Sequence, residues 1–218
     1  KELSVAARSS TDPASNPRLR GALSAARAAN MPKDNIERVL KRAEGGEGDA
    51  YEEIRYEGYG PGGVAFIVEA MTDNRNRTAS EVRSFFSKFG GSLAETGSVS
   101  FMFDKVGQIV YPLAVADAET MFEAALEAGA DNVETEEDSH VITTDAEQFN
   151  AVRENIEKQF DATEEAAIIW QPQNSIAVEE ANASTLLKLY DALDENDDVQ
   201  SVFANFEISD EIMTKLDG

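Results

Sequence analysis

The sequence predicts an α+β protein: an N-terminal helical bundle domain, then two α+β domains of ferredoxin-like type, the last inserted in the middle one. Three observations predict it. Residues 1–43 show helical periodicity, residues 54–89 read as a strand followed by a helix, and the later chain alternates short strands with amphipathic helices. With 42% hydrophobic residues in a chain of 218, there is enough apolar material for packed cores.

The first segment is predicted to form three helices. One helix covers Lys1–Arg8, a second is capped by Asn16 with Pro17 at its first position, and a third begins around Pro32. Between Arg18 and Arg42 lie five arginines and two lysines, against two acidic residues. One interpretation is that Lys and Arg near a helix C-terminus only complement the helix dipole. Because seven basic residues are more than the dipole requires, the other interpretation is a basic face that binds a polyanion. The polar run at 44–49 then predicts a domain boundary.

The central stretch holds the most regular pattern. Apolar residues fill both faces of a predicted strand from Val64 to Met71, and a helix follows, with Thr78 as predicted N-cap and Glu81 closing a capping box. The polar turn at 72–77, which contains Asn74, Arg75 and Arg77, therefore sits on a rigid strand–helix pair. Binding residues are held most accurately in such a position.

The glycines before that strand fit a G-x-G-x-x-G pattern at Gly58, Gly60 and Gly63. A dinucleotide fingerprint must follow a strand and open a helix, whereas these glycines precede the strand. A tight turn entering the strand explains them better.

The later elements are predicted in the order of the chain. Strands are expected at Val99–Phe103 and Gln108–Tyr111, a helix at Asp117–Ala128, two short strands flanking Glu136–Ser139, a helix at Ala146–Phe160, a strand at Ala166–Trp170, a helix at Ser184–Leu193 and a strand at Val199–Phe206. The last helix and strand supply the αβ pair that the middle domain lacks. The predicted domains are therefore residues 1–45, residues 51–112 with 174–218, and an inserted acidic domain at 113–173.

Charge is distributed unevenly along the chain, whose net charge is −23. Residues 1–44 carry 9 basic and 5 acidic residues, whereas residues 96–218 carry 5 basic and 28 acidic residues. This asymmetry predicts that the N-terminal end meets a polyanion. For the acidic half alone, an ordinary solvated surface is the simpler interpretation.

The residue types argue against catalysis. The chain has no cysteine, and its one histidine, His140, is expected to be a surface strand residue. The run Asp194–Asp198 begins like a calcium loop but places Val199 where glycine is required. Acidic residues around Glu136 leave a metal-dependent enzyme as a further alternative, although such runs are usually solvated turns. We expect no enzyme, no cofactor, no metal and no small-molecule substrate.

Targeting signals are also absent. Nothing resembles a signal peptide or an apolar span of about twenty residues, so a cytoplasmic protein without a membrane partner is expected.

Several long runs resemble the YebC/PmpR family, which includes the mitochondrial translational activator of cytochrome c oxidase. These runs are NPRLR at 16–20, ARAANMPKDNIERVLKRA at 26–43, YEGYGPGGVAFIVEAMTDNRNRT at 56–78, GSLAETGSVSFMF at 91–103 and DDVQSVFANFEI at 197–208. Family members usually open with a short basic segment of the type GHSKWANI, which does not precede Lys1 here.

The resemblance implies three domains and a non-enzymatic role in gene expression. Some relatives are described as DNA-binding transcriptional regulators, and others act on translation, associate with ribosomal RNA and help proline-rich stretches through the ribosome. The expected partner is therefore ribosomal RNA or the ribosome, with duplex DNA as the alternative.

The basic residues of the second and third helices and of the polar turn could neutralise phosphates without reading the base sequence. The predicted nucleic-acid-binding residues are Arg18, Arg20, Arg27, Lys33, Arg38, Lys41, Arg42, Asn74, Arg75 and Arg77. A helix-turn-helix signature with base-contacting side chains is weak, which favours the ribosome over duplex DNA. Tyr56 and Tyr59 either stack on exposed bases or pack in the core.

Overall fold

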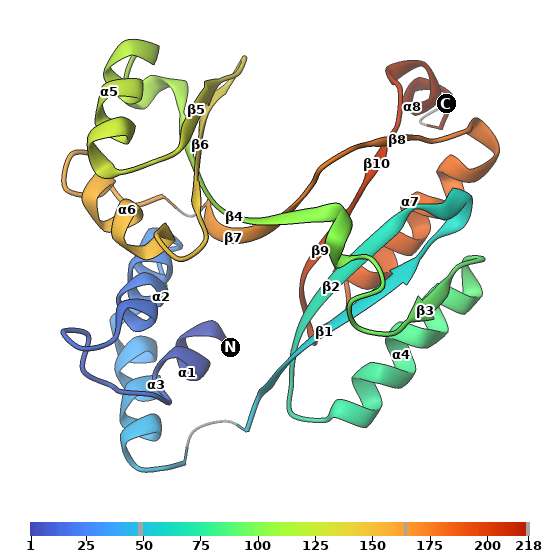
Figure 1. Cartoon of the computed structure of the whole chain (residues 1–218). Coiled ribbons are helices and arrows are strands. Elements are labelled where there is room, and N and C mark those ends of the chain that lie inside the picture. Colours follow the sequence, from blue (N-terminus) through green and yellow to red (C-terminus); the bar gives the residue numbers. More distant parts are fainter. Residues whose placement is uncertain (48–49, 164, 217–218) are drawn as a thin grey trace. The chain divides into compact units, whose positions relative to one another are not determined.

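The computed structural model describes residues 1–47, 50–163 and 165–216 (Figure 1). It divides into two compact units, each made of two chain segments: Lys1–Asp49 with Lys105–Ile169, and Ala50–Asp104 with Trp170–Gly218. Helices come first, and α+β structure follows, as the sequence predicts. The boundaries predicted for three domains stay a prediction.

The first unit begins with three helices, α1 (Glu2–Ala6), α2 (Pro17–Ala28) and α3 (Lys33–Glu44). Asn16 caps α2 as predicted, because its side chain accepts a hydrogen bond from the Leu19 N–H. The helices pack around a small apolar core of leucines and alanines that includes Leu19, Leu23 and Ile36.

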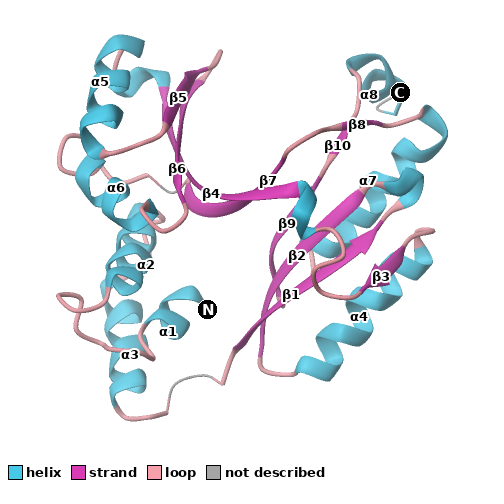
Figure 2. Ribbon diagram, in the orientation of Figure 1, coloured by secondary structure: helices cyan, strands magenta, loops and turns pink. Residues whose placement is uncertain are grey.

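The rest of the first unit is a sheet covered by two helices. Its elements are β4 (Phe103–Pro112), η3 (Leu113–Val115), α5 (Ala118–Ala128), β5 (Asn132–Thr135), β6 (Ser139–Asp145), α6 (Phe149–Ile156) and β7 (Ala166–Pro172). The strand order is β5-β6-β4-β7, and α5 and α6 lie on one side of this sheet (Figure 2). Gly129 ends α5 in the left-handed conformation, as a helix C-cap glycine does.

A buried arginine joins the helical part of this unit to its sheet part. Arg153 of α6 is 4% exposed, and its guanidinium occupies the space where a Cβ at Gly21 of α2 would lie. Next to it, Arg20 Nε lies 2.6 Å from Glu154 Oε1, and the Ser24 hydroxyl donates to Glu157 at 2.8 Å. A larger residue at position 21 would have to displace this guanidinium, so glycine leaves room for Arg153 between α2 and α6.

The second unit is built on a four-stranded sheet. Its elements are β1 (Glu52–Tyr59), η1 (Pro61–Gly63), β2 (Ala65–Thr72), α4 (Arg75–Lys88), β3 (Ser92–Ala94), η2 (Ser100–Met102), β8 (Ile176–Ala177), α7 (Glu180–Asp194), β9 (Val199–Ala204), β10 (Phe206–Glu207) and α8 (Asp210–Leu216). The order is β3-β1-β2-β9. Because β9 pairs with β2, the C-terminal αβ pair joins the central stretch, as predicted.

The strand β2 is buried on both faces, as its apolar run predicts. Phe66 and Val68 face the core under α4 and α7, whereas Ala65 and Ile67 face a second cluster that contains Phe103. Gly60 and Gly63 lie in the tight turn with η1 between β1 and β2, as predicted, whereas Gly58 lies in β1.

Two predicted strands after Gly91 differ from the structure. Residues 99–102 do not form a strand, because the buried Glu57 carboxylate accepts hydrogen bonds from the N–H groups of Gly97, Val99 and Ser100 and folds that loop around itself, and Phe103 is the first residue of β4. Residues 108–111 do form a strand, but as part of β4, which pairs with β6 in the first unit. The strand β1 takes their place beside β2.

Candidate nucleic-acid interface

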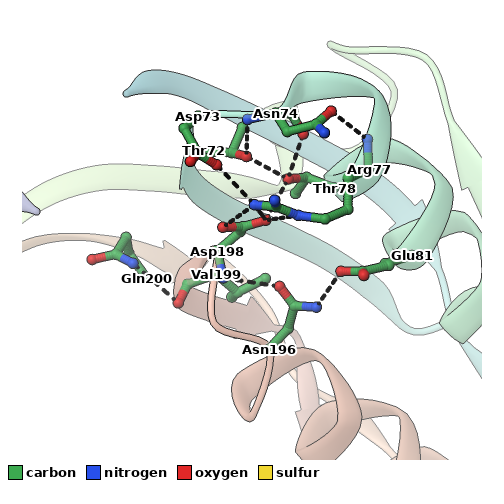
Figure 3. Close-up of polar contacts among 10 residues, drawn as sticks. All are labelled: Thr72, Asp73, Asn74, Arg77, Thr78, Glu81, Asn196, Asp198, Val199 and Gln200. Carbon is green, nitrogen blue, oxygen red and sulfur yellow. Dashed lines mark hydrogen bonds and ion pairs between the residues drawn. The ribbon is translucent and has the colours of Figure 1, made fainter. Parts of the chain in front are cut away.

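The turn between β2 and α4 is fixed by local hydrogen bonds. The Asn74 side chain accepts from the Arg77 N–H at 3.1 Å, and the Thr72 hydroxyl accepts from the Asn74 N–H at 2.9 Å (Figure 3). Asn74 is therefore the N-cap of α4, and the predicted cap at Thr78 is wrong. Thr78 is fully buried one turn later, where its hydroxyl bonds Thr72 at 2.8 Å.

Arg77 is committed to carboxylates of its own unit. Its Nη2 and Nε donate to Asp198 Oδ2 at 2.7 and 3.2 Å, and Nη2 also contacts Asp73 at 3.0 Å (Figure 3). These hydrogen bonds, the one to Asp198 first and then the one to Asp73, raise the pKa of Arg77. Asp198 is 5% exposed and also accepts from the Thr78 hydroxyl at 2.8 Å. Arg77 thus fastens the turn to the start of β9.

A second set of hydrogen bonds connects α4 to the segment before β9. Asn196 donates to Glu81 of α4 at 2.8 Å and accepts from the Asp198 N–H at 3.0 Å (Figure 3). The acidic run that resembles a calcium loop in the sequence therefore anchors α4 through side-chain hydrogen bonds. Two independent connections restrain the turn, so the side chains that it exposes are presented from a fixed backbone.

Arg75 is the more exposed of the two arginines in this turn. It is 68% exposed, and its nearest carboxylate is Glu52 at 3.6 Å. An exposed pair at that distance is weak, so a phosphate could displace Glu52 at little cost.

The predicted binding residues of the first unit, seven basic residues between Arg18 and Arg42, fall into two groups. Arg18 pairs with Glu2 at 2.8 Å, and Arg20 pairs with Glu154 in the α2–α6 contact. The others are exposed on α2 and α3, namely Arg27, Lys33, Arg38, Lys41 and Arg42. Lys33 lies 3.5 Å from Glu37, and Arg38 donates to Asn35 at 2.6 Å. Arg38, Lys41 and Arg42, three and four residues apart, are neighbours on α3.

Comparison with known proteins covers both parts of the chain. Residues 1–46 match the family model described as the TACO1/YebC protein N-terminal domain, and residues 51–206 match that described as the TACO1/YebC second and third domain. The fold is similar to the crystal structure of a conserved hypothetical protein, Aq1575, from Aquifex aeolicus. The TM-score is 0.87 at 47% identity, over 97% of this chain and 88% of that chain.

The chain belongs to the TACO1/YebC family. The resemblance seen in the sequence is thereby confirmed. Membership is consistent with a nucleic-acid-binding regulator, and the family is a regulatory one. Within the described ranges, no helix is long and apolar enough to cross a bilayer.

The two tyrosines considered for base stacking, Tyr56 and Tyr59, pack against apolar clusters of the second unit. Tyr56 is half-buried against the cluster under α4 and α7, and its hydroxyl is buried without a hydrogen-bond partner in the described part of the chain. Burial raises the pKa of Tyr56. Tyr59 packs on the opposite face of the sheet, and its hydroxyl donates to the Ser98 carbonyl at 3.4 Å. Both rings therefore pack against apolar side chains of the second unit.

His140 is not a surface residue, contrary to the prediction. It is fully buried on β6, where Nε2 lies 2.8 Å from the Ala116 carbonyl and Nδ1 lies 2.9 Å from the Thr135 hydroxyl. Because a carbonyl only accepts, Nε2 donates to Ala116. The side chain is a structural bridge between η3, β5 and β6.

Sequence reasoning missed Asp198 and Glu57, two carboxylates that are buried in the second unit. For Asp198 a signal existed, because the turn at 72–77 holds two arginines and an N-cap asparagine without enough local acceptors. Glu57 has no comparable signal, since its partners are backbone N–H groups that become neighbours only on folding.

Proposed function

We propose that this protein is a translation factor that binds ribosomal RNA on the ribosome through phosphate contacts. The observation that carries the proposal is the exposed group Arg38, Lys41 and Arg42 on α3. These cations extend from a helix whose other face is buried, so they are available to a polyanion without cost to the core.

The proposed contact set is the one predicted from the sequence, with distinct roles for its members. Exposed side chains would meet phosphates, and these are Arg27, Lys33, Arg38, Lys41, Arg42, Asn74 and Arg75. Arg18 would exchange the Glu2 carboxylate for a phosphate. Arg20 and Arg77, which are held by Glu154 and Asp198, would keep their elements in place.

The exposed side chains favour shape and charge recognition over base reading. Reading duplex DNA in the major groove needs Asn, Gln or Arg aimed at base edges from one helix. On α3 the Asn35 amide oxygen accepts from Arg38, and the N-terminal positions that would enter a groove are Lys33 and Asp34. Contacts to phosphates alone suit a structured RNA that the protein need not read.

The test is co-sedimentation with purified ribosomes across a salt series, beside a gel shift on random and genomic duplex DNA. We expect saturable ribosome binding that weakens with salt. Replacing Arg38, Lys41 and Arg42 by Ala should make the slope of log K against log salt shallower by roughly two, since three phosphate contacts are lost. Arg75→Ala should weaken binding further, whereas Arg83→Ala, an exposed arginine outside the set on the same helix, should not.

Two results would contradict the proposal. Wild-type affinity in the triple variant would remove α3 from the interface. Absence of ribosome binding, together with a duplex preferred roughly a thousandfold over random DNA, would make the protein a transcriptional regulator instead.

A further inference from the structure

Helix α5 has a second apolar stripe that its own unit does not use. Its buried side, Met121, Ala124, Ala125 and Ala128, packs in the core of the first unit. On the outer side, Phe122 is 51% exposed and Leu126 is 63% exposed. At 3.6 residues per turn these two side chains lie within roughly 40° of each other, so they form one continuous strip along the helix.

Glutamates line the strip on one side. Glu119, Glu123 and Glu127 recur every four residues and are all exposed. By the same helical geometry they lie within roughly 100° of Leu126, on the side away from the core. A large aromatic and a leucine beside a row of carboxylates is the pattern of an amphipathic binding face.

The charge of the surrounding chain is of one sign. From residue 106 to residue 152 the sequence has 11 acidic residues and no lysine or arginine. No cation within this segment therefore neutralises the row of glutamates. A nucleic acid would be repelled here, whereas a positively charged polypeptide would be attracted.

We propose that the outer face of α5 binds a basic amphipathic polypeptide segment of another protein. Apolar side chains of that segment pack on Phe122 and Leu126, and its lysines or arginines face Glu119, Glu123 and Glu127. A second copy of this chain fits less well. Two α5 faces would oppose glutamate to glutamate, and the basic helix α3 already buries its apolar side in its own core. The proposal does not depend on the nucleic-acid contacts proposed above.

Fluorescence anisotropy with two labelled probe peptides tests this directly. One is a leucine–lysine amphipathic helix of about four turns, and the other keeps every lysine but replaces every leucine by serine. The wild type should bind the first peptide more tightly. Replacing Phe122 and Leu126 by Ser should lower that affinity roughly tenfold or more and leave the serine peptide unaffected.

Two matched variants separate the apolar contact from charge. Ile176→Ser with Met213→Ser removes two other exposed apolar side chains, 36% and 37% exposed in the second unit, and should bind both peptides like the wild type. Glu119→Gln, Glu123→Gln and Glu127→Gln together should weaken the binding of both peptides.

Amide chemical shifts of the wild type on addition of the leucine–lysine peptide should change mainly along α5, which gives a readout without any substitution.

Three outcomes would overturn the proposal. If the wild type and the Phe122/Leu126 variant bound the leucine–lysine peptide equally, the peptide would be held by the acidic surface alone and not by an apolar contact on α5. Shift changes spread over all acidic segments would have the same meaning. A wild-type dimer at micromolar concentration that this variant abolishes would make a second copy the occupant.

Discussion

Asp198 shows how one buried carboxylate organises an exposed turn. It receives the guanidinium of Arg77 and the hydroxyl of Thr78, and through them holds the turn that displays Arg75. Charge-assisted hydrogen bonds at a buried acceptor are among the stronger polar interactions in proteins, because water does not compete for them.

Asp198→Asn should lower the free energy of unfolding by about 2 kcal/mol, since the amide replaces an acceptor oxygen by a donor facing Arg77. The matched control is Asp73→Asn. Asp73 contacts the same guanidinium but is 62% exposed, and exposed ion pairs contribute little. Urea unfolding of the three proteins checks this. Equal destabilisation by both substitutions would mean that burial of Asp198 is not what matters.

Glu57 gives the second unit a dependence on pH. Burial raises the pKa of its carboxyl, but the N–H groups of Gly97, Val99 and Ser100, together with Arg55, lower the pKa below its ordinary value. A carboxyl with a depressed folded pKa stabilises the fold above its unfolded pKa of about 4.3, and this stabilisation is lost as pH falls through the folded value.

Glu57→Gln should therefore cost about 2 kcal/mol at pH 7, and this difference from the wild type should shrink as the pH falls below about 4. Denaturant unfolding at a series of pH values measures it. Glu95→Gln, at an exposed position near the same loop, should show neither the cost nor the pH dependence. A difference that persists unchanged at low pH would show that the charge of Glu57 is not the source of the stability.

At the scale of elements, a glycine sets how closely α4 returns to the sheet. A Cβ at Gly91 would overlap the backbone carbonyl of Tyr59 in β1, so β3 could not keep its pairing with β1. Backbone atoms cannot rotate away as a side chain does. Gly91→Ala should destabilise the second unit by about 2 kcal/mol, an overpacking cost, and increase amide exchange in β3.

Gly45→Ala provides the control for that change. At position 45 the added Cβ would meet only the Lys41 and Arg42 carbonyls at 3.6 and 3.7 Å, which are ordinary contacts. We expect no loss of stability there, measured by the same urea titration. Loss at position 45 as large as at position 91 would point to a general cost of replacing glycine.

The elements that the sequence predicts well are those whose signal is local. The apolar run of β2, the cap at Asn16 and the terminating Gly129 each specify structure within a few residues. Elements whose conformation depends on distant partners were missed. The strand β1 carries charges at Glu53, Arg55 and Glu57, and the folded loop at 97–100 supplies the N–H groups that make burial of Glu57 possible.

The candidate site divides in the same way. Exposed cations on α3 follow from helical spacing, which the sequence displays directly. The pairing of Arg20 with Glu154 and of Arg77 with Asp198 joins residues more than 100 positions apart, with no local pattern to announce it. Composition therefore indicates a basic surface, but folding decides which of its arginines already have partners.

At the scale of the whole molecule, the net charge of −23 opposes compactness. This net charge lies in residues 96–218, where carboxylates outnumber cations 28 to 5, because residues 1–95 balance to zero. Repulsion among like charges is screened by salt, because the Debye length falls from about 30 Å at 0.01 M to about 3 Å at 1 M. Added salt should weaken the repulsion among the carboxylates more than it weakens the attraction within the few ion pairs.

The melting temperature should therefore rise between about 0.01 and 1 M NaCl, with the same curve in KCl. Replacing Glu136 and Glu137 by Gln, in the exposed acidic turn between β5 and β6, should raise the melting temperature at low salt and flatten the curve. Glu37→Gln should do neither, because Glu37 lies 3.5 Å from Lys33 in the basic segment. A melting temperature that falls with salt would show that attractive pairs outweigh the acidic repulsion, and the uneven charge would then be a feature of partner selection alone.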